Sequence, residues 1–187
     1  MRESVKSGRS VVIHEPTSGH PVRVFISYSH DSRTHKRRVL ALANRLRREG
    51  IDAVLDQYEQ NPRDGWTLWM EKQIRDADFV LVVCSETYHR RVMKEEAVGA
   101  GLGVCWEAHI IYQYLFDDGS ANWRFLPVLF AGATVSDIPR PLRAFARYKV
   151  DSREGYAPLY CRLTNQQPIA KPPLGKVRIL AKRRATR

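Results

Sequence analysis

The sequence has few cysteines and no long apolar run. Its three cysteines, Cys84, Cys105 and Cys161, are an odd number and lie far apart, without the spacing of a metal site or a disulfide framework. Thiols of this kind are typical of a reducing compartment, so we expect a cytoplasmic protein. No apolar stretch approaches the roughly 20 residues that span a bilayer. Residues 1–20 also lack the apolar block of a secretory signal, so we expect neither a membrane span nor an export signal.

Sequence patterns of several enzyme classes are also absent. Ser, His and Asp are contiguous at 29–31, so their side chains diverge and do not form a catalytic relay. The glycine-rich segment 99–103 does not directly follow a strand, as a dinucleotide-binding loop would. His89 and His109 have no second ligand at a useful spacing. We therefore expect no metal site and no bound cofactor.

The positive charge of the chain is concentrated at its C-terminal end. Of a formal net charge of +11, residues 171–187 supply +7, with seven basic and no acidic side chains. Residues 24–170 hold 20 basic and 18 acidic side chains and are close to neutral, so they give no argument for a nucleic-acid groove. The tail could bind phosphates or anionic lipid non-specifically. We favour a solvated end of the chain over a segment that contacts nucleic acid or membrane.

Segments typical of strands and helices alternate along the chain. Apolar, β-branched runs predict strands, and apolar residues three or four apart predict helices. The expected strands are 21–29, 51–56, 78–85, 124–130 and 146–150. The expected helices are 33–49, 66–77, 105–116 and 154–163, with a long polar insertion at 86–104. We expect Asp31 or Ser32 to cap the first helix and Gly50 to end it.

This alternation predicts an α/β fold with a parallel sheet and helices on both faces. For five strands in one domain, the expected architecture is a flavodoxin-like, open, doubly wound sheet of order 2-1-3-4-5 in three αβα layers. We expect the domain to span residues 21–165. Residues 1–20 are expected to form a flexible N-terminal extension, and residues 166–187 a flexible basic tail.

Ligands of such sheets bind beyond the carboxyl ends of the strands, where the strand order reverses. Here that point lies between the first and third strands, so the loops that begin at Ser29 and Ser85 should meet there. The loop at 56–65 should lie alongside. Topology also places Glu107, at the start of the helix 105–116, near this crevice. Apolar residues share its helix face, so we expect a partly desolvated carboxylate.

The chain resembles the SEFIR domains of bacterial type in four segments, VFISYSHDS, DAVLDQYEQNPRDGW, DADFVLVVCSETY and WEAHII. These domains are relatives of the Toll/interleukin receptor (TIR) superfamily. Each segment alone is weak evidence for the family, whereas the occurrence of all four in this order, over about residues 21–165, is specific evidence. The resemblance implies a signalling module that assembles through contacts with a second copy or with other SEFIR and TIR-like domains. It assigns self-association to the loop around Pro62, Asp64 and Gly65.

The resemblance also implies an activity. Many bacterial and some eukaryotic TIR-like domains cleave NAD+ at the nicotinamide–ribose bond, and bacterial SEFIR proteins are linked to defence against phage by NAD+ depletion. In the enzymatic members, the essential group is a glutamate after a tryptophan at the start of the third helix. Trp106 and Glu107 match that pair, although TIR domains have two more residues between them. Glu95 and Glu96 are competitors, less favoured because a flexible loop positions a carboxylate poorly.

A single carboxylate suits this chemistry. Loss of nicotinamide leaves positive charge on the ribose, which a fixed Glu107 carboxylate can stabilise while it holds the ribose hydroxyls. Nicotinamide is already a cationic leaving group in NAD+, so no second carboxylate has to protonate it. NAD+ is therefore expected as a substrate and not as a cofactor.

Five further residues are candidate contacts of this substrate. The rings of Tyr28, Trp66 and Trp106 can stack on its bases, and Arg63 can pair with its diphosphate. Packing in the core is as strongly favoured for Trp66 as contact with the substrate. For Arg63, a solvated charge on the loop is as strongly favoured as pairing with the diphosphate. Ser29 either hydrogen-bonds the ligand or caps its helix.

Two hypotheses about function follow. In the first, the domain hydrolyses NAD+ after self-assembly. In the second, it is a non-catalytic adaptor that recruits a similar domain through the exposed loop at 57–65.

Overall fold

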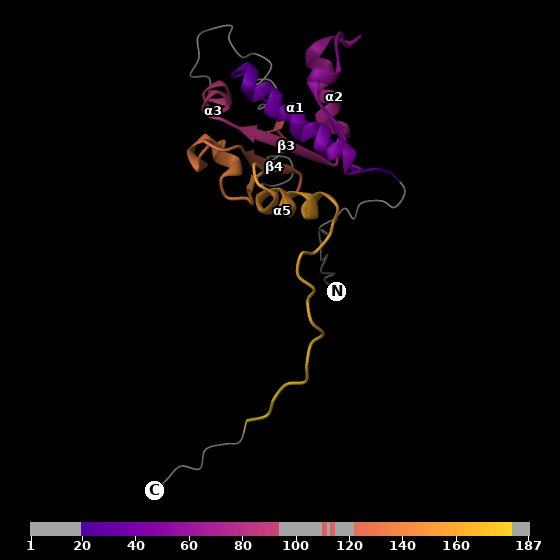
Figure 1. Ribbon diagram of the computed structural model, residues 1–187, viewed down its shortest axis with the longest axis vertical. Helices are drawn as coiled ribbons and strands as arrows, with labels where there is room; N and C mark the ends of the chain where they lie inside the picture. Colours follow the sequence, from indigo (N-terminus) through magenta and orange to yellow (C-terminus); the bar gives the residue numbers. More distant parts are fainter. Residues whose placement is uncertain (1–19, 94–109, 112, 115–121, 181–187) are drawn as a thin grey trace, which may run out of the picture.

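The sheet has five strands and is parallel throughout. The computed structural model describes residues 20–93, 110–111, 113–114 and 122–180 (Figure 1). The strands are β1 Arg23–Tyr28, β2 Asp52–Val54, β3 Phe79–Cys84, β4 Phe125–Leu129 and β5 Tyr148–Lys149. They follow the order β2-β1-β3-β4-β5, and each pair is parallel. The predicted flavodoxin-like, doubly wound fold is confirmed.

The strands β1, β3 and β4 form the buried centre of the sheet. Every residue of β4 is buried, and β1 and β3 are buried from their second residue onward. Such strands are apolar almost throughout because helices cover both faces of a parallel sheet. Tyr28 pairs with Val83, and Val83 with Val128, so the three strands end at about the same level. The residues that follow them therefore gather at one edge.

One face of the sheet is covered by α1 (Arg33–Arg48) and α5 (Arg153–Leu163). α1 begins where the Ser32 hydroxyl accepts a hydrogen bond of 3.0 Å from the backbone N–H of His35, as expected of a helix N-cap. It ends before Gly50, whose φ of 89° lies in the left-handed region that glycine tolerates. The predicted start and end of this helix are both confirmed.

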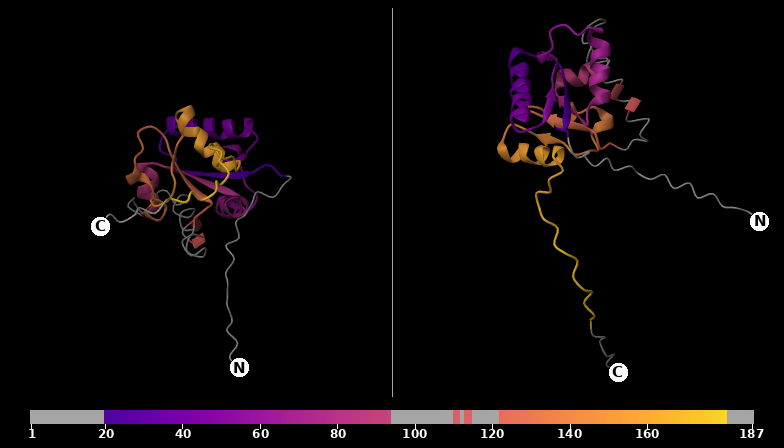
Figure 2. Two further views of the ribbon diagram at one scale, coloured as in Figure 1. Left: turned by 90° about the horizontal axis from the view of Figure 1, so that it is seen from below. Right: turned by 90° about the vertical axis from the view of Figure 1, so that its right-hand side faces the viewer.

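The opposite face is covered by α2 (Gly65–Asp76), α3 (Glu86–Val92) and the helical residues 110–111 and 113–114. The right-hand view of Figure 2 shows α1 and α2 on opposite sides of the sheet. Buried side chains on the α2 side form one cluster, which includes Phe25, Ile74, Val82, Tyr88, Ile111 and Leu129. The predicted three αβα layers are confirmed.

The helix α3 corrects one sequence-based prediction. A polar insertion was expected from residue 86 onward, but residues 86–92 are helical. The Ser85 hydroxyl starts this helix by accepting a hydrogen bond of 3.0 Å from the Tyr88 N–H. A helix of 7 residues spans too few turns for its apolar periodicity to be recognised in the sequence.

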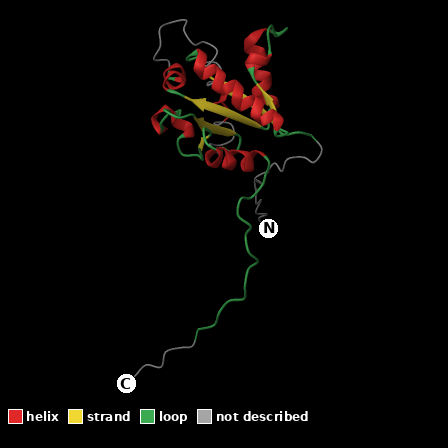
Figure 3. Cartoon of the chain, in the orientation of Figure 1, coloured by secondary structure: helices red, strands yellow, loops and turns green. Residues whose placement is uncertain are grey.

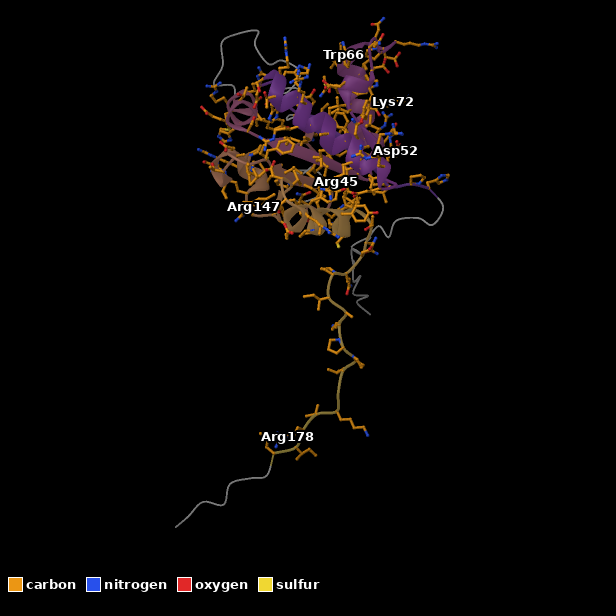
Figure 4. The ribbon with its side chains drawn as sticks, in the orientation of Figure 1. Arg45, Asp52, Trp66, Lys72, Arg147 and Arg178 are labelled. Carbon is orange, nitrogen blue, oxygen red and sulfur yellow. The ribbon has the colours of Figure 1, made fainter. Side chains whose placement is uncertain are left out.

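Beyond α5, the described chain up to residue 180 has no helix or strand, and Figure 3 draws it as loop. Arg178 lies in this segment, far from the domain (Figure 4). Exposed apolar side chains accompany its basic ones: Ile169, Leu174, Val177, Ile179 and Leu180. The flexibility of the tail stays a prediction. In the part of the chain that the structure describes, no helix combines the length and apolar character needed to cross a membrane.

Candidate functional site

The loops after β1 and β3 meet through two serine hydroxyls. Ser29 Oγ and Ser85 Oγ lie 3.1 Å apart, at hydrogen-bonding distance. The Ser29 hydroxyl donates its proton to the Asp31 carboxylate, so Ser85 is the donor within the serine pair. Ser29 is fully buried. The prediction that these two loops meet where the strand order reverses is confirmed.

The loop after β2 also contacts this edge of the sheet. Gln57 Nε2 donates a hydrogen bond of 2.9 Å to the Tyr28 hydroxyl, and His30 Nε2 donates one of 2.7 Å to the Asp56 carboxylate. The prediction that this loop lies alongside the crevice is therefore confirmed. Tyr28 is only 5% exposed, and its ring packs against the His30 ring with 5.1 Å between centroids. Stacking of Tyr28 on a base stays a prediction.

Ser29 does not cap a helix, which was one of the two roles considered for it. Ser32 caps α1, whereas Ser29 bonds to Asp31 and Ser85. The capping role is therefore wrong for Ser29, because its hydroxyl points across the sheet edge to the loop after β3. Its contact with a ligand stays a prediction.

A cleft of about 730 Å³ adjoins the serine pair at the ends of β3 and β4. Three parts of the chain form it: the first turns of α1, the segment from Cys84 into α3, and the residues after β4. Its lining comprises His35, Arg38, Cys84, Ser85, Glu86, His89, Arg90, Phe130–Thr134, Ser136, Asp137 and Arg143. We refer to it as the β3–β4 cleft.

Most charged groups of the β3–β4 cleft already have partners. Arg38 forms an ion pair of 2.5 Å with Asp151 and lies over the Phe130 ring. The Asp137 carboxylate accepts a hydrogen bond of 2.6 Å from the backbone N–H of Thr134. Arg143 instead donates hydrogen bonds to two backbone carbonyls, at 2.7 and 2.8 Å. Carbonyls orient a guanidinium group without neutralising it, so Arg143 keeps its positive charge.

Two histidines of the cleft have an unpaired ring nitrogen. His35 Nε2 and His89 Nδ1 are buried atoms, and neither has a hydrogen-bond partner among the described residues. Burial lowers the pKa of His35 below its usual value of 6.5, with Arg38 and His30 acting in the same direction and Asp31 against them. His35 is therefore neutral at pH 7.

Cys84, at the base of the cleft, does not have the properties of a nucleophile. Burial raises the pKa of its thiol to about 12, so the reactive thiolate is not formed at neutral pH. Within the described residues, no group of three His, Cys, Asp or Glu side chains is close enough to hold a metal ion.

The predicted self-association loop lies away from the β3–β4 cleft. Arg63, Asp64 and Gly65 are exposed, Pro62 is buried, and none of the four lines the cleft. Gly65 has a φ of 77°, a backbone conformation that favours glycine, and it begins α2. Diphosphate binding by Arg63 and self-association through this loop stay predictions.

Trp66 is exposed at the outer end of α2 (Figure 4). It is 44% exposed and makes an edge contact with Trp69, at 5.7 Å between ring centroids. Trp69 in turn packs on Phe25 of the sheet. Core packing is therefore wrong for Trp66, whereas its neighbour Trp69 packs against the sheet. Leu68, two positions after Trp66, is 58% exposed.

The predicted catalytic pair, Trp106 and Glu107, lies outside the described residues, as do Glu95 and Glu96. Their roles stay predictions. The polar lining of the β3–β4 cleft was missed by the sequence-based reasoning. The sequence gives one signal for this lining, which is position: His35 and His89 each lie on a helix that directly follows a central strand.

Comparisons with known proteins agree with this fold. The SEFIR domain family matches residues 22–154. The crystal structure of a prokaryotic SEFIR domain superposes with a TM-score of 0.54 at 29% identity, covering 82% of this chain and 99% of that chain. The SEFIR domain of IL-17 receptor B gives a TM-score of 0.53 at 14% identity, covering 78% of this chain and 97% of that chain.

A metazoan TIR-STING receptor from C. gigas, solved in complex with 2',3'-cGAMP, has a TM-score of 0.54 at 19% identity. That similarity covers 78% of this chain and 40% of the receptor chain and concerns the fold alone. The family match extends over most of the chain, from before β1 to the start of α5. This chain belongs to the SEFIR domain family.

Proposed function

We propose that this SEFIR domain hydrolyses NAD+, with Glu107 as the catalytic carboxylate and self-assembly as the trigger. The bond between nicotinamide and the ribose breaks, and nicotinamide leaves with the bonding electrons. Water adds its oxygen to the ribose carbon and releases a proton. Glu107 orients the ribose and stabilises the positive charge of the transition state. In a cytoplasm this reaction would deplete NAD+, in keeping with the antiviral defence that the resemblance implies.

The observation that carries this proposal is the β3–β4 cleft beside the Ser29–Ser85 pair. The cleft lies beyond the carboxyl ends of β3 and β4 and adjoins, through Ser85, the point between β1 and β3 where doubly wound sheets bind ligands. Its size of about 730 Å³ falls within the range of about 300–1,000 Å³ usual for small-molecule sites. Membership of the SEFIR family and the matching residues Trp106 and Glu107 add support.

The test is nicotinamide release from NAD+ by the purified chain, measured by chromatography at several protein concentrations. We expect turnover that rises more steeply than the protein concentration, because assembly precedes catalysis. Glu107→Gln keeps the shape of the side chain and removes its charge, so it should abolish turnover. Glu95→Gln and Glu96→Gln are matched controls and should retain it. Full turnover by Glu107→Gln would refute the assignment of the catalytic group.

A second function is favoured by three exposed apolar side chains in and after the loop that follows β2. Tyr58, Trp66 and Leu68 are 43%, 44% and 58% exposed. We propose, as the alternative, a non-catalytic adaptor that binds a second SEFIR or TIR-like domain here. Self-association without NAD+ turnover supports this function, and a protein that is monomeric at every concentration contradicts it.

A further inference from the structure

The outer side of α1 carries basic side chains and no acidic ones. The helix has seven Lys or Arg residues and no Asp or Glu. Its exposed positions 33, 37, 41, 44 and 48 are three or four residues apart, as positions on one side of a helix are. Three of these positions are Arg33, Arg37 and Arg48. We refer to these three residues as the α1 stripe.

The charge of this helix is only partly neutralised within the domain. Three of its seven basic side chains form ion pairs: Arg38 with Asp151, Arg45 with Glu49 and Arg47 with Asp52. The α1 stripe and Lys36 form none within the described residues. Asp31, just before the helix, accepts a hydrogen bond from the Ser29 hydroxyl and keeps its negative charge. The solvent side of α1 is therefore positively charged even with Asp31 included.

The basic tail, residues 166–187, begins on the same side of the sheet. α1 and α5 cover one face, and the tail begins just after α5 ends (Figure 1). No acidic residue follows Glu154, and residues 171–187 carry a charge of +7. Up to residue 180 the tail also has five large apolar side chains, each at least 73% exposed: Ile169, Leu174, Val177, Ile179 and Leu180.

The tail is long enough to lie beside α1. At about 3.4 Å per residue, the segment 166–180 can reach about 50 Å when extended. The helix α1, with its 16 residues, is about 24 Å long. A flat surface on the α1 side of the domain can therefore contact the α1 stripe and the tail at the same time.

The mixture of aliphatic and basic side chains favours one kind of partner. Single-stranded nucleic acids stack their bases on aromatic side chains, and no aromatic residue follows Tyr160. Aliphatic side chains are stabilised where they leave water, as at the boundary between lipid headgroups and acyl chains. Lys and Arg beside them keep their charges among the headgroups. A membrane with anionic lipids satisfies both kinds of side chain.

We propose that the α1 stripe and the tail together bind an anionic lipid surface. Arg33, Arg37 and Arg48 attract the headgroups, while Ile179 and Leu180 insert between headgroups and acyl chains. The sequence alone favoured a solvated tail. The α1 stripe adds a second contact on the same face, and two linked contacts bind more tightly than either one alone. The proposal does not depend on NAD+ hydrolysis.

The test is co-sedimentation of the full-length protein with vesicles of phosphatidylcholine, alone or mixed with phosphatidylglycerol. Binding should require the anionic lipid and weaken as salt rises, because salt screens the attraction. Arg37→Gln should weaken it about fivefold, the effect of one basic side chain near a charged membrane. Lys72→Gln is the matched control, because it removes an exposed charge from α2 on the opposite face of the sheet (Figures 2 and 4).

Ile179→Gln tests the apolar contact and should weaken binding by about fivefold or more. Ala170→Gln is its control, at an exposed position of the same tail with little apolar area. All four substituted positions are exposed, so thermal unfolding should match that of the wild type.

Three results would overturn the proposal. The first is equal sedimentation with the two kinds of vesicle. The second is equal binding by Arg37→Gln and Lys72→Gln, or by Ile179→Gln and Ala170→Gln. The third is tighter binding to a DNA or RNA oligonucleotide than to anionic vesicles, unchanged by Ile179→Gln, which would assign the basic surface to nucleic acid.

Discussion

Ser29 and Ser85 lie 56 positions apart in the sequence, yet their hydroxyl oxygens are 3.1 Å from each other. This contact joins the carboxyl ends of β1 and β3, the two strands between which the order of the sheet reverses. Ser85 also caps α3 by accepting the Tyr88 N–H at 3.0 Å. One hydroxyl therefore fixes both the crevice and the helix beside it.

We predict that Ser85→Ala destabilises the domain more than Ser32→Ala does. Each substitution removes a helix cap, at a cost of about 1 kcal/mol. Ser85→Ala also removes a partner of the buried Ser29 hydroxyl, which should add about 1 kcal/mol to the loss. Urea unfolding measures both free energies, and equal losses would show that the serine pair contributes nothing to stability.

The lowered pKa of His35 makes the free energy of unfolding depend on pH. Because burial lowers its pKa below 6.5, the folded state binds a proton there less readily than the unfolded state. Its contribution to stability is therefore complete above the unfolded pKa and declines as pH falls below about 6.5. Between pH 7.5 and 5, unfolding of His35→Gln should depend less on pH than unfolding of the wild type. Parallel curves for the two proteins would contradict this.

A tyrosine on α5 holds the end of α1. The Tyr156 hydroxyl donates a hydrogen bond of 2.5 Å to the Glu49 carboxylate, and Arg45 lies 3.4 Å above the Tyr156 ring. Burial alone would raise the pKa of Glu49, but the bonds from Tyr156 and Arg45 outweigh it and lower the pKa below 4.5. The stability gained from this carboxylate is present above pH 4.5 and is lost as pH falls through its folded pKa.

Tyr156→Phe should accordingly cost about 1 kcal/mol at pH 7. The difference from the wild type should narrow in acid, when Glu49 becomes protonated in both proteins. Urea unfolding at pH 7 and near pH 3 checks this, with Tyr160→Phe as control, because Tyr160 bonds the Glu49 carbonyl and not its carboxylate. A difference that stays constant with pH would rule out the carboxylate as the partner that matters.

The exposed Leu68 side chain on α2 gives a prediction about assembly. Leu68→Asp should leave stability within about 0.5 kcal/mol of the wild type, because the side chain is largely exposed. It should nevertheless abolish self-association measured by analytical ultracentrifugation. Thr67→Asp is the matched control, since it adds the same charge at a neighbouring exposed position without removing apolar area. Equal assembly by both variants would exclude this surface as the interface.

The fold was predictable because its signals are local. Apolar runs such as 78–85 identify the central strands, and alternation with helices implies the parallel order that the sheet has. The meeting of the loops after β1 and β3 was predictable for the same reason, since topology alone determines which strand ends are neighbours.

The site was predictable only in part because side-chain partners are not encoded locally. Ser29 pairs with Ser85 and does not cap a helix, and this pairing depends on two loops whose serines are 56 positions apart. The cleft around Arg143 depends on three segments whose approach no single pattern reveals. Core packing was one of two roles expected of Trp66, but its position at the outer end of α2 leaves it exposed.

Nicotinamide release by the wild type and by Glu107→Gln, at equal concentration and with matched thermal stability, is the most direct measurement of the central claim. The account predicts release by the wild type that increases with assembly, and none by the variant. Equal release by the two proteins, or no release by the assembled wild type, would contradict it.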